Sequence, residues 1–427
     1  MDHVQRQAFQ TFKEALLMMT EKNQLHLTPN ELPPLRRGTV CYLVGAGLSA
    51  ESIYQVPTAV GFFSREFTKH YRDEENQTKL PNDDWDLGYL LDRIENDYGP
   101  LAELNLETVM TDLYVRAFGI AKSWETYDYV GALRRPIPEL RRDYRLLLHY
   151  INERLPWLDR SSKRCKKLEA FVELVRREDS VATLNYDTTL ERHLCEREFP
   201  SGNHLGYLKS SVTPPGSTVG GPAPPMFHGA KPSGERGVFT KLHGSKDWFT
   251  CANELCPNSR YIQPMGPWDR FREVEEETTQ GAPRCAQCGS SRRRVIVPPT
   301  ATKPFEEFPK LGVMWAQSYE AFRRAQRWVF VGVSLAATDF HLSSFLRSLT
   351  RGQVGEKVGR EDSCDVCIVN PDYGNVAQRF VDSLGPCAAH EFRAGGRLIY
   401  VFDSVEEFLT KARASDQRKS PDESPPH

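Results

Sequence analysis

The sequence predicts an α/β protein with a Rossmann-like, doubly wound parallel sheet, a large helical insert and a small zinc-ribbon module. Three observations support this fold class. Short apolar runs without polar alternation recur along the chain, as in a parallel sheet that is covered on both faces. The segment at about 62–178 repeats apolar residues at helical spacing. Four cysteines stand in two pairs with the spacing of metal ligands.

The composition limits the classes of function. The chain has 427 residues, of which 39% are hydrophobic, enough for two or three domains with packed cores. Its 55 basic and 57 acidic residues nearly cancel, so nucleic acid is not the expected ligand. No apolar run approaches the ~20 residues that span a bilayer, and the N-terminal segment is charged where a secretory signal is apolar. We therefore expect a soluble, cytoplasmic protein without membrane contact.

The chain divides into an N-terminal segment, a sheet domain in two parts, and a tail. Residues 1–38 are expected to hold an amphipathic helix, over residues 4–22, and a linker that contains proline. The two parts of the sheet domain are 39–248 and 296–411, and the zinc ribbon, 249–295, separates them. The end of the chain, 412–427, is expected to be disordered.

Seven apolar runs are typical of strands, and turns or helices separate them. These runs are Thr39–Val44, Ser180–Leu184, Val238–Leu242, Arg294–Val297, Trp328–Val333, Asp365–Val369 and Leu398–Phe402. The stretch Pro200–Arg236 is dense in glycine, proline, serine and threonine, which favours a mobile loop near a site.

A glycine turn follows the first strand, in the run Val44-Gly-Ala-Gly-Leu-Ser. Glycines at such a turn let backbone amides come close to a pyrophosphate, and Ser49 offers a hydroxyl. A tight turn that binds no ligand explains the same residues, because the full GxGxxG spacing is absent.

Asn185 and Asp187 follow the second strand, in the run Thr183-Leu-Asn-Tyr-Asp. Open α/β sheets bind ligands at the carboxyl ends of their strands, so two polar side chains at this place can line one pocket. Asp187 is alternatively the cap of a helix that begins at Thr188.

His243 follows the third strand and precedes a glycine that leaves room for a ligand. An imidazole accepts a proton near neutral pH, which makes His243 a candidate general base. It is also one of eleven histidines, most of which are expected to be solvated or structural.

The four clustered cysteines indicate a closed, structural zinc site. Cys251 and Cys256 form one pair, Cys285 and Cys288 form the other, and proline or glycine follows the second cysteine of each pair. Two such turns supply four thiolates in a tetrahedron. Removal of the metal is expected to unfold this module.

Two later strands also end in polar turns. Gly332 and Ser334 follow the run that begins at Trp328, and Asn370 follows the run that begins at Asp365, where its amide could hold a ribose hydroxyl. Each turn alone has an ordinary structural explanation. Together with the earlier motifs they make five polar turns at successive strand ends.

The order of these motifs resembles the sirtuin family, whose members bind NAD in a Rossmann-type fold that carries a zinc ribbon. The motifs GAGLS, TLNYD, LHGS, the four cysteines, GVS and VNP follow one another in the family's order, from about Thr39 to Ser404. The resemblance implies that Asn185 orients the ribose or a water and that His243 is the general base. It implies that NAD is held by Gly45, Ala46, Gly47, Ser49, Asp187, Gly332, Ser334 and Asn370. It implies that the zinc ligands are Cys251, Cys256, Cys285 and Cys288.

Departures from the family's pattern bear on the activity. Sirtuin deacylases usually carry a Pro-Asp-Phe-Arg loop after the first glycine motif, and here the run Val56-Pro-Thr-Ala-Val-Gly-Phe-Phe has no arginine at the matching place. Leu184 stands where the family has glutamine, and a long helical insert separates Gly45 from Asn185. In these respects the chain resembles divergent sirtuin-like domains that hydrolyse NAD, several of which act in bacterial antiphage defence.

We therefore expect an NAD hydrolase that releases nicotinamide and ADP-ribose, with NAD as substrate and zinc as a structural ion. Because an unregulated NAD hydrolase would deplete its own cell, we expect a resting state that a homo-oligomer or a partner protein relieves. Two alternatives stay open. In the first, the protein is an NAD-dependent protein-lysine deacylase or ADP-ribosyltransferase. In the second, it is a non-catalytic module that binds NAD or ADP-ribose.

Overall fold

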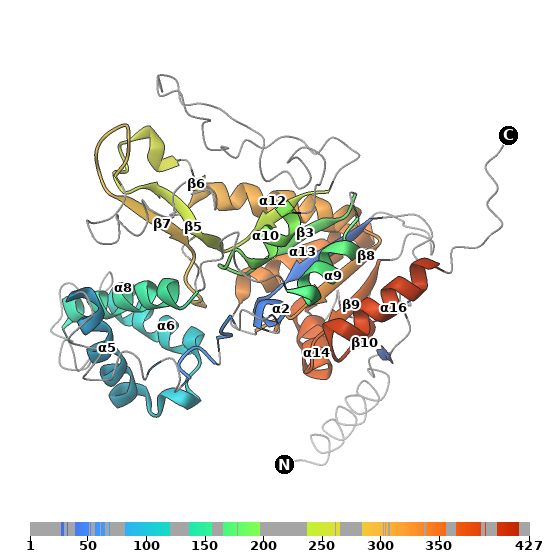
Figure 1. The fold of residues 1–427 in the computed structure, drawn as a ribbon, viewed down its shortest axis with the longest axis horizontal. Coiled ribbons are helices and arrows are strands. Elements are labelled where there is room, and N and C mark those ends of the chain that lie inside the picture. Colours follow the sequence, from blue (N-terminus) through green and yellow to red (C-terminus); the bar gives the residue numbers. More distant parts are fainter. Residues whose placement is uncertain are drawn as a thin grey trace, which may run out of the picture.

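A parallel sheet of seven strands forms the centre of the computed structural model of the chain (Figure 1). The structure describes residues 27–417 apart from single residues, short runs and longer stretches. The longest stretches outside the description are 33–38, 69–81, 120–135, 156–164, 197–236, 265–283, 356–363 and 390–398. The helix expected over 4–22 and the loop expected over Pro200–Arg236 lie outside the described residues.

The sheet has the order β1-β10-β9-β8-β2-β3-β4, and all six neighbouring pairs are parallel. Its strands are β1 (Leu27–Pro29), β2 (Val40–Val44), β3 (Ser180–Thr183), β4 (Phe239–Lys241), β8 (Arg327–Val331), β9 (Asp365–Val369) and β10 (Ile399–Phe402). The chain winds outward from β2 to β3 and β4 on one side, and from β8 to β9 and β10 on the other. The strand order therefore reverses between β2 and β8, and the predicted doubly wound fold is confirmed.

Helices cover both faces of this sheet (Figure 1). One face carries α12 (Pro309–Arg324), α13 (Phe340–Gly355) and α14 (Tyr373–Leu384), and the other carries α9 (Lys166–Leu174), α10 (Thr189–Glu196) and α16 (Val405–Gln417). In β2, Cys41 and Leu43 face the first group of helices, whereas Tyr42 faces the second. Because helices bury both faces of the sheet, the strand shows no alternation of polar and apolar residues.

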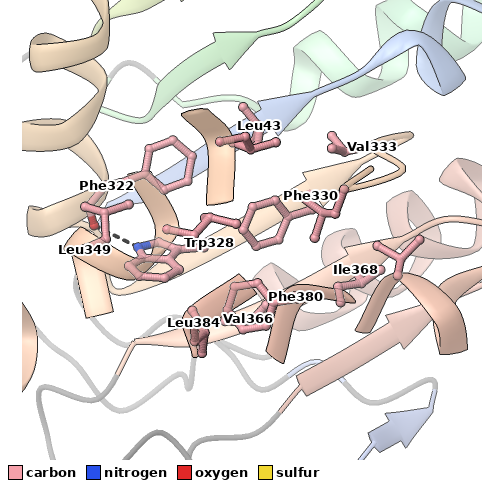
Figure 2. Close-up of a cluster of buried hydrophobic side chains, with 14 of the residues drawn as sticks. Leu43, Phe322, Trp328, Phe330, Val333, Leu349, Val366, Ile368, Phe380 and Leu384 are labelled. Atoms are coloured by element: carbon pink, nitrogen blue, oxygen red, sulfur yellow. Dashed lines mark hydrogen bonds between the residues drawn. The ribbon is translucent and has the colours of Figure 1, made fainter. Parts of the chain in front are cut away.

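The larger of the two cores is built on aromatic side chains (Figure 2). Trp328 of β8 is fully buried and its indole Nε1 donates to the carbonyl oxygen of Phe322 at 2.8 Å. The rings of Phe322 and Trp328 meet edge to face with centroids 5.9 Å apart, and Phe330 lies 5.5 Å from Phe380 of α14. The satisfied indole allows a tryptophan to stand in an apolar core without leaving an unpaired donor.

The helical insert has a hydrophobic core of its own, which begins at Val56 and ends at Leu155. Its helices are α5 (Asn82–Tyr98), α6 (Leu106–Tyr114) and α8 (Ile137–Arg154), with the 3₁₀ turn Leu101–Glu103 and the π turn Val115–Gly119 between them. The prediction that the insert extends to about 178 is wrong. Helix α9 packs on the sheet instead, because Leu168 and Phe171 are buried against β2 and β3.

A second, antiparallel sheet has the order β6-β5-β7. Its strands are β5 (Gly244–Cys251), β6 (Gln263–Pro264) and β7 (Arg292–Ile296), and a 3₁₀ turn, Pro257–Arg260, follows the second cysteine. The interpretation of the run from Arg294 as a strand of the parallel sheet is wrong. Its apolar end is nevertheless buried, because Val295 and Val297 pack with Trp248.

Two predictions about the ends of the chain also need correction. Strand β1, which pairs with β10, lies within the segment expected to hold only a helix and a linker. Helix α16 continues to Gln417, so residues 412–417 are helical rather than part of a disordered tail. Ala412 and Ser415 are buried, which explains why the helix continues. None of the described helices is long and apolar enough to cross a membrane.

Candidate functional site

The turns that follow the central strands are joined by backbone hydrogen bonds. Gly45 N, just past β2, donates to the carbonyl oxygen of Val331 at 2.9 Å, and Leu184 N, just past β3, donates to that of Val44 at 2.9 Å. The turns after β2, β3 and β8 therefore lie side by side at the carboxyl edge of the sheet. This edge adjoins the point where the strand order reverses, which is where open α/β sheets bind ligands.

Gly45 and Gly47, at the start of the short helix α2 (Ala46–Ala50), pack against Gly332 in the turn after β8. A Cβ atom on Gly45 would lie 2.5 Å from the carbonyl oxygen of Gly332, and one on Gly332 would lie 2.4 Å from Leu48 N. Gly332 also has φ of +61°, which favours glycine. Gly47 N donates to the Gly332 carbonyl at 3.0 Å. The close approach of the two turns requires these glycines, and pyrophosphate binding by Gly45, Ala46 and Gly47 stays a prediction.

Asn185 lies at the centre of this edge and is 7% exposed. Its side-chain Nδ2 donates to the carbonyl oxygen of Gly45 at 3.0 Å and to Ser49 Oγ at 3.0 Å. Its backbone N donates to Thr183 Oγ1 at 3.1 Å. Both the backbone and the amide of Asn185 are therefore fixed, and the structure brings this residue together with the glycine turn.

Asp187 is buried and stands two residues before the first residue of helix α10. Its Oδ1 accepts hydrogen bonds from the backbone N of Thr189, at 2.9 Å, and from the Thr189 hydroxyl, as in the capping alternative. The same oxygen accepts from Ser49 Oγ at 3.3 Å. Asp187 thus supports Ser49, and through it Asn185. A direct contact of Asp187 with a ribose stays a prediction.

His243 lies just past β4, beside the end of β3. Leu242 N donates to the carbonyl oxygen of Thr183 at 2.9 Å, which sets this position. The imidazole is buried, and its Nε2 has no hydrogen-bond partner among the described residues. Three aromatic rings stand around it with centroids 6.2 to 6.4 Å away, those of Tyr186, Phe305 and Trp315.

The surroundings of His243 favour the neutral imidazole. Burial lowers its pKa to about 3, with a further contribution from the positive charge of Lys303, while the carboxylate of Asp339 acts in the opposite direction. Hydrogen bonding to the backbone of Leu184 acts on the pKa in the same direction as Asp339, but more weakly. At neutral pH the imidazole is therefore uncharged, and a neutral imidazole has one ring nitrogen whose lone pair can accept a proton.

The glycine that follows His243 does not make room for a ligand, contrary to the sequence prediction. Gly244 has φ of +82°, and a Cβ atom there would lie 2.0 Å from the carbonyl oxygen of Val295. Strand β7 thus occupies the space beside Gly244. The glycine is needed where the chain leaves the parallel sheet and pairs with β7.

The turns after β8 and β9 are also in contact with each other. Asn370 Nδ2 donates to the carbonyl oxygen of Val333 at 3.2 Å, and its Oδ1 accepts from Asp372 N at 2.8 Å. Ser334 is exposed, and its carbonyl oxygen accepts from Arg379 Nη1 at 3.0 Å. The amide of Asn370 therefore holds two turns together. Contacts of Asn370 and Ser334 with an adenosine ribose stay predictions.

A buried ion pair lies beneath the site. Lys241 Nζ donates to the carboxylate of Glu191 and to the backbone carbonyl of Asp187. Burial raises the pKa of Glu191 to about 7, against the effect of Lys241. This pair fixes the start of α10 to the end of β4. Asp187 stands just before α10, and His243 stands just after β4.

The four cysteines predicted as metal ligands come together at one end of the antiparallel sheet. All four Sγ atoms lie within 4.8 Å of one another, with Cys251 and Cys288 at 3.4 Å and Cys256 and Cys285 at 3.9 Å. Sulfurs around a tetrahedral Zn²⁺, at about 2.3 Å from the ion, stand roughly 3.8 Å apart, so the cluster has the size of a zinc site. Asn258 Nδ2 donates to Cys285 Sγ at 3.4 Å and so supports one of the four sulfur atoms from outside the cluster.

The comparisons with known proteins give one kind of match. No family model and no curated protein matches the sequence. Solved Sir2 structures align along the chain. One, described as a structural basis for the mechanism and regulation of Sir2 enzymes, is 13% identical, covers 90% of this chain and 93% of its own, and has a TM-score of 0.33. A Sir2 homologue mutant in complex with ADP-ribose is 14% identical, covers 90% of this chain and 94% of its own, and has a TM-score of 0.35. A Sir2 mutant with p53 peptide and NAD is 13% identical, covers 89% of this chain and 92% of its own, and has a TM-score of 0.33.

Two charged residues at the site, Lys303 and Asp339, are not among the predicted site residues. Lys303 and Asp339 are both buried beside His243. Asp339 stands shortly after the motif Gly332-Val-Ser, so its position after the strand end is a signal that could have found it. Lys303 follows the cysteine module, and nothing in the sequence around it indicates a site.

Proposed function

We propose that the protein hydrolyses NAD to nicotinamide and ADP-ribose. The observation that carries the proposal is the placement of two groups at neighbouring strand ends: the fixed amide of Asn185, which is bound to the glycine turn, and the neutral imidazole of His243. The order of the sirtuin-like motifs along the chain supports NAD as the nucleotide.

The chemistry needs little from the protein beyond these groups. Cleavage of the bond between nicotinamide and ribose releases a neutral base and leaves oxocarbenium character on the ribose, so positioning matters more than a strong nucleophile. Asn185 would orient the ribose or the attacking water, and the Nε2 atom of His243 would take the proton that the water loses. The glycine turns would hold the diphosphate, and this remote binding energy would help to keep the reacting groups in place.

The proposal includes a physiological setting. The departures from the deacylase pattern at the run after Val56 and at Leu184 support the branch of NAD hydrolases that act as regulated effectors in antiphage defence in the bacterial cytoplasm. Such an effector would rest in an inhibited state and become active on assembly into a homo-oligomer or on contact with a partner protein. Full activity of the purified chain at every concentration would exclude this regulation.

One observation favours a second activity, NAD-dependent deacylation of protein lysines or ADP-ribosyl transfer. The cysteine cluster is complete and is linked to the site through β5, which runs from Gly244 to Cys251. In the sirtuin family a substrate lies between the nucleotide fold and the zinc module. An acyl-lysine or another acceptor would then replace water.

A product assay with three proteins tests the proposed function. Nicotinamide and ADP-ribose are quantified for the wild type, Asn185→Ala and His243→Ala, with and without an acylated peptide. The hydrolase gives nicotinamide and ADP-ribose from NAD alone, and both variants are impaired. For His243→Ala the expected loss is on the order of 10²- to 10⁴-fold. Release that depends on the acylated peptide would support the second activity, and binding of NAD without any product would support a non-catalytic module.

A further inference from the structure

A buried charge pair faces the free nitrogen of His243. Asp339 Oδ2 lies 3.7 Å from His243 Nε2, and Lys303 Nζ lies 3.4 Å from the same carboxylate oxygen. All three side chains are buried, with 7%, 9% and 2% of the side-chain area of His243, Asp339 and Lys303 exposed. Charges in such a place act on one another with little screening by water.

The neighbourhood of the imidazole contains few other ionisable groups among the described residues. His341, on α13, is exposed, and its positive form would disfavour protonation of His243. Tyr186, after β3, is neutral because burial raises its pKa well above the usual value, and its hydroxyl donates to the carbonyl oxygen of Val297 at 2.6 Å. In the part of the chain that the structure describes, Lys303 and Asp339 are therefore the full charges closest to the ring.

Asp339 is held in place from two sides. Its Oδ1 accepts a hydrogen bond from Leu342 N at 3.1 Å at the start of α13, and Lys303 lies at Oδ2. Burial alone would raise the pKa of Asp339, but the positive charges of a protonated His243 and of Lys303 and the bond from Leu342 together lower it. The carboxylate is thus ionised, and its Oδ2 atom, which also contacts Lys303, lies 3.7 Å from His243 Nε2.

We propose that Lys303 and Asp339 are positioning residues that control proton transfer to His243, a role that rests on the proposed hydrolase activity. In the resting site Lys303 neutralises Asp339, so the imidazole stays neutral and ready to accept. When the bond between the ribose and nicotinamide breaks and a water forms the new bond to the ribose, the proton of that water moves to Nε2. The carboxylate of Asp339 then stabilises the imidazolium until the proton passes to solvent.

Removal of Lys303 and removal of Asp339 are expected to change the pKa of His243 in opposite directions. Lys303→Met removes a positive charge, so the pKa of His243 rises and the acid side of the pH profile of kcat/KM moves to higher pH by at least one unit. Asp339→Asn removes the stabilising carboxylate, so this pKa falls, and kcat drops at least tenfold while KM for NAD changes less. Lys303→Arg keeps the charge and is expected to restore the wild-type profile. A purely structural role would not move the profile in opposite directions.

An NMR titration reads His243 directly, without NAD. Protein with ¹³C-labelled histidine is titrated from pH 8 to pH 4.5, and the His243 signal is assigned by its loss in His243→Gln. The wild-type signal is expected to keep the neutral shift throughout, and Lys303→Met is expected to bring its midpoint into this range. Lys411→Met, which removes an exposed lysine on α16, is the control and leaves the signal unchanged.

The outcomes separate this proposal from the proposed function. A wild-type His243 signal that titrates near the ordinary histidine pKa of about 6.5 would overturn the proposal, even if no variant folds. The proposal would also be overturned if Lys303→Met and Asp339→Asn shifted the pKa of His243 by the same amount in the same direction. If the titration behaves as expected but the protein releases no nicotinamide, Lys303 and Asp339 do control the protonation of His243, and the proposed hydrolase function is contradicted.

Discussion

Asn185 and Gly45 are 140 positions apart in the sequence, and a hydrogen bond of 3.0 Å joins the side-chain amide of the first to the backbone carbonyl of the second. The helical insert fills most of the sequence between them and has its own core. The insert therefore adds a separate layer of helices without disturbing the contact between β2 and β3. The site depends on the sheet, whose strands fix which turns meet.

The first prediction concerns this contact. Asn185→Ala removes two hydrogen bonds, to Gly45 and to Ser49, and is expected to lower the free energy of unfolding by about 1 kcal/mol for each. Because the freed Ser49 hydroxyl keeps Asp187 as a partner, the fold is expected to survive. Urea denaturation measures the stability and nicotinamide release measures the activity. A variant that is destabilised but fully active would remove Asn185 from the catalytic groups.

The second prediction concerns the packing of the glycine turns. Gly332→Ala places a methyl group 2.4 Å from Leu48 N at a φ of +61°, so the two turns must move apart. The left-handed backbone alone costs about 1 kcal/mol for a residue other than glycine, and the contact adds to this. The expected result is a lower melting temperature together with weaker NAD binding, measured by calorimetry.

The matched control is Gly312→Ala. Gly312 lies in helix α12 with open space around the position of a Cβ atom. Alanine in a helix interior is favoured over glycine by up to about 1 kcal/mol, so this variant is expected to be as stable as the wild type or more so. If both variants lose stability equally, the close approach of the two turns is not what requires Gly332.

The sequence predicted the central strands well because they are apolar on both faces. Five of the runs became strands of the parallel sheet beside the first one, and their polar ends define the site. Strand β1 escaped prediction because it is short, contains a proline and pairs on one side only, at the edge of the sheet. The run from Arg294 was assigned to the wrong sheet, since burial alone does not distinguish parallel from antiparallel neighbours.

The site was predictable only where a motif stands at a strand end. Asn185 and His243 follow two neighbouring strands, so their shared edge follows from the topology. Lys303 and Asp339 reach His243 through folding of segments on the far side of the cysteine module, and no spacing in the sequence records that contact. For Gly244 the prediction failed because the space beside it is filled by β7, a strand that comes much later in the chain.

The third prediction concerns the metal. The purified chain is expected to bind one zinc ion, and Cys256→Ser is expected to lose it, because three thiolates and a hydroxyl hold zinc less tightly than four thiolates. The measurements are zinc content by mass spectrometry and the melting temperature, which falls in the variant. Cys364→Ala, which changes a buried cysteine outside the cluster, is the control and keeps its zinc. A wild type without zinc, or a variant that keeps it, would contradict the assignment.

The fourth prediction follows from the low pKa of His243. In the folded protein this pKa is about 3, against about 6.5 in an unfolded chain, so the unfolded state binds a proton first as the pH falls. The stability that the neutral, buried imidazole contributes is thus complete above pH 6.5 and is lost progressively between pH 6.5 and pH 3. His243→Gln does not titrate and lacks this loss.

The check compares the free energy of unfolding of the wild type and His243→Gln in urea at pH 7.5 and at pH 5.5. Other titrating groups contribute equally to both proteins and cancel in the difference. Between these two pH values the wild type is expected to lose about 1.4 kcal/mol relative to the variant. If the difference in free energy of unfolding between the two proteins stays constant with pH, the imidazole of His243 is solvated enough to titrate normally. Burial would then not explain a neutral His243.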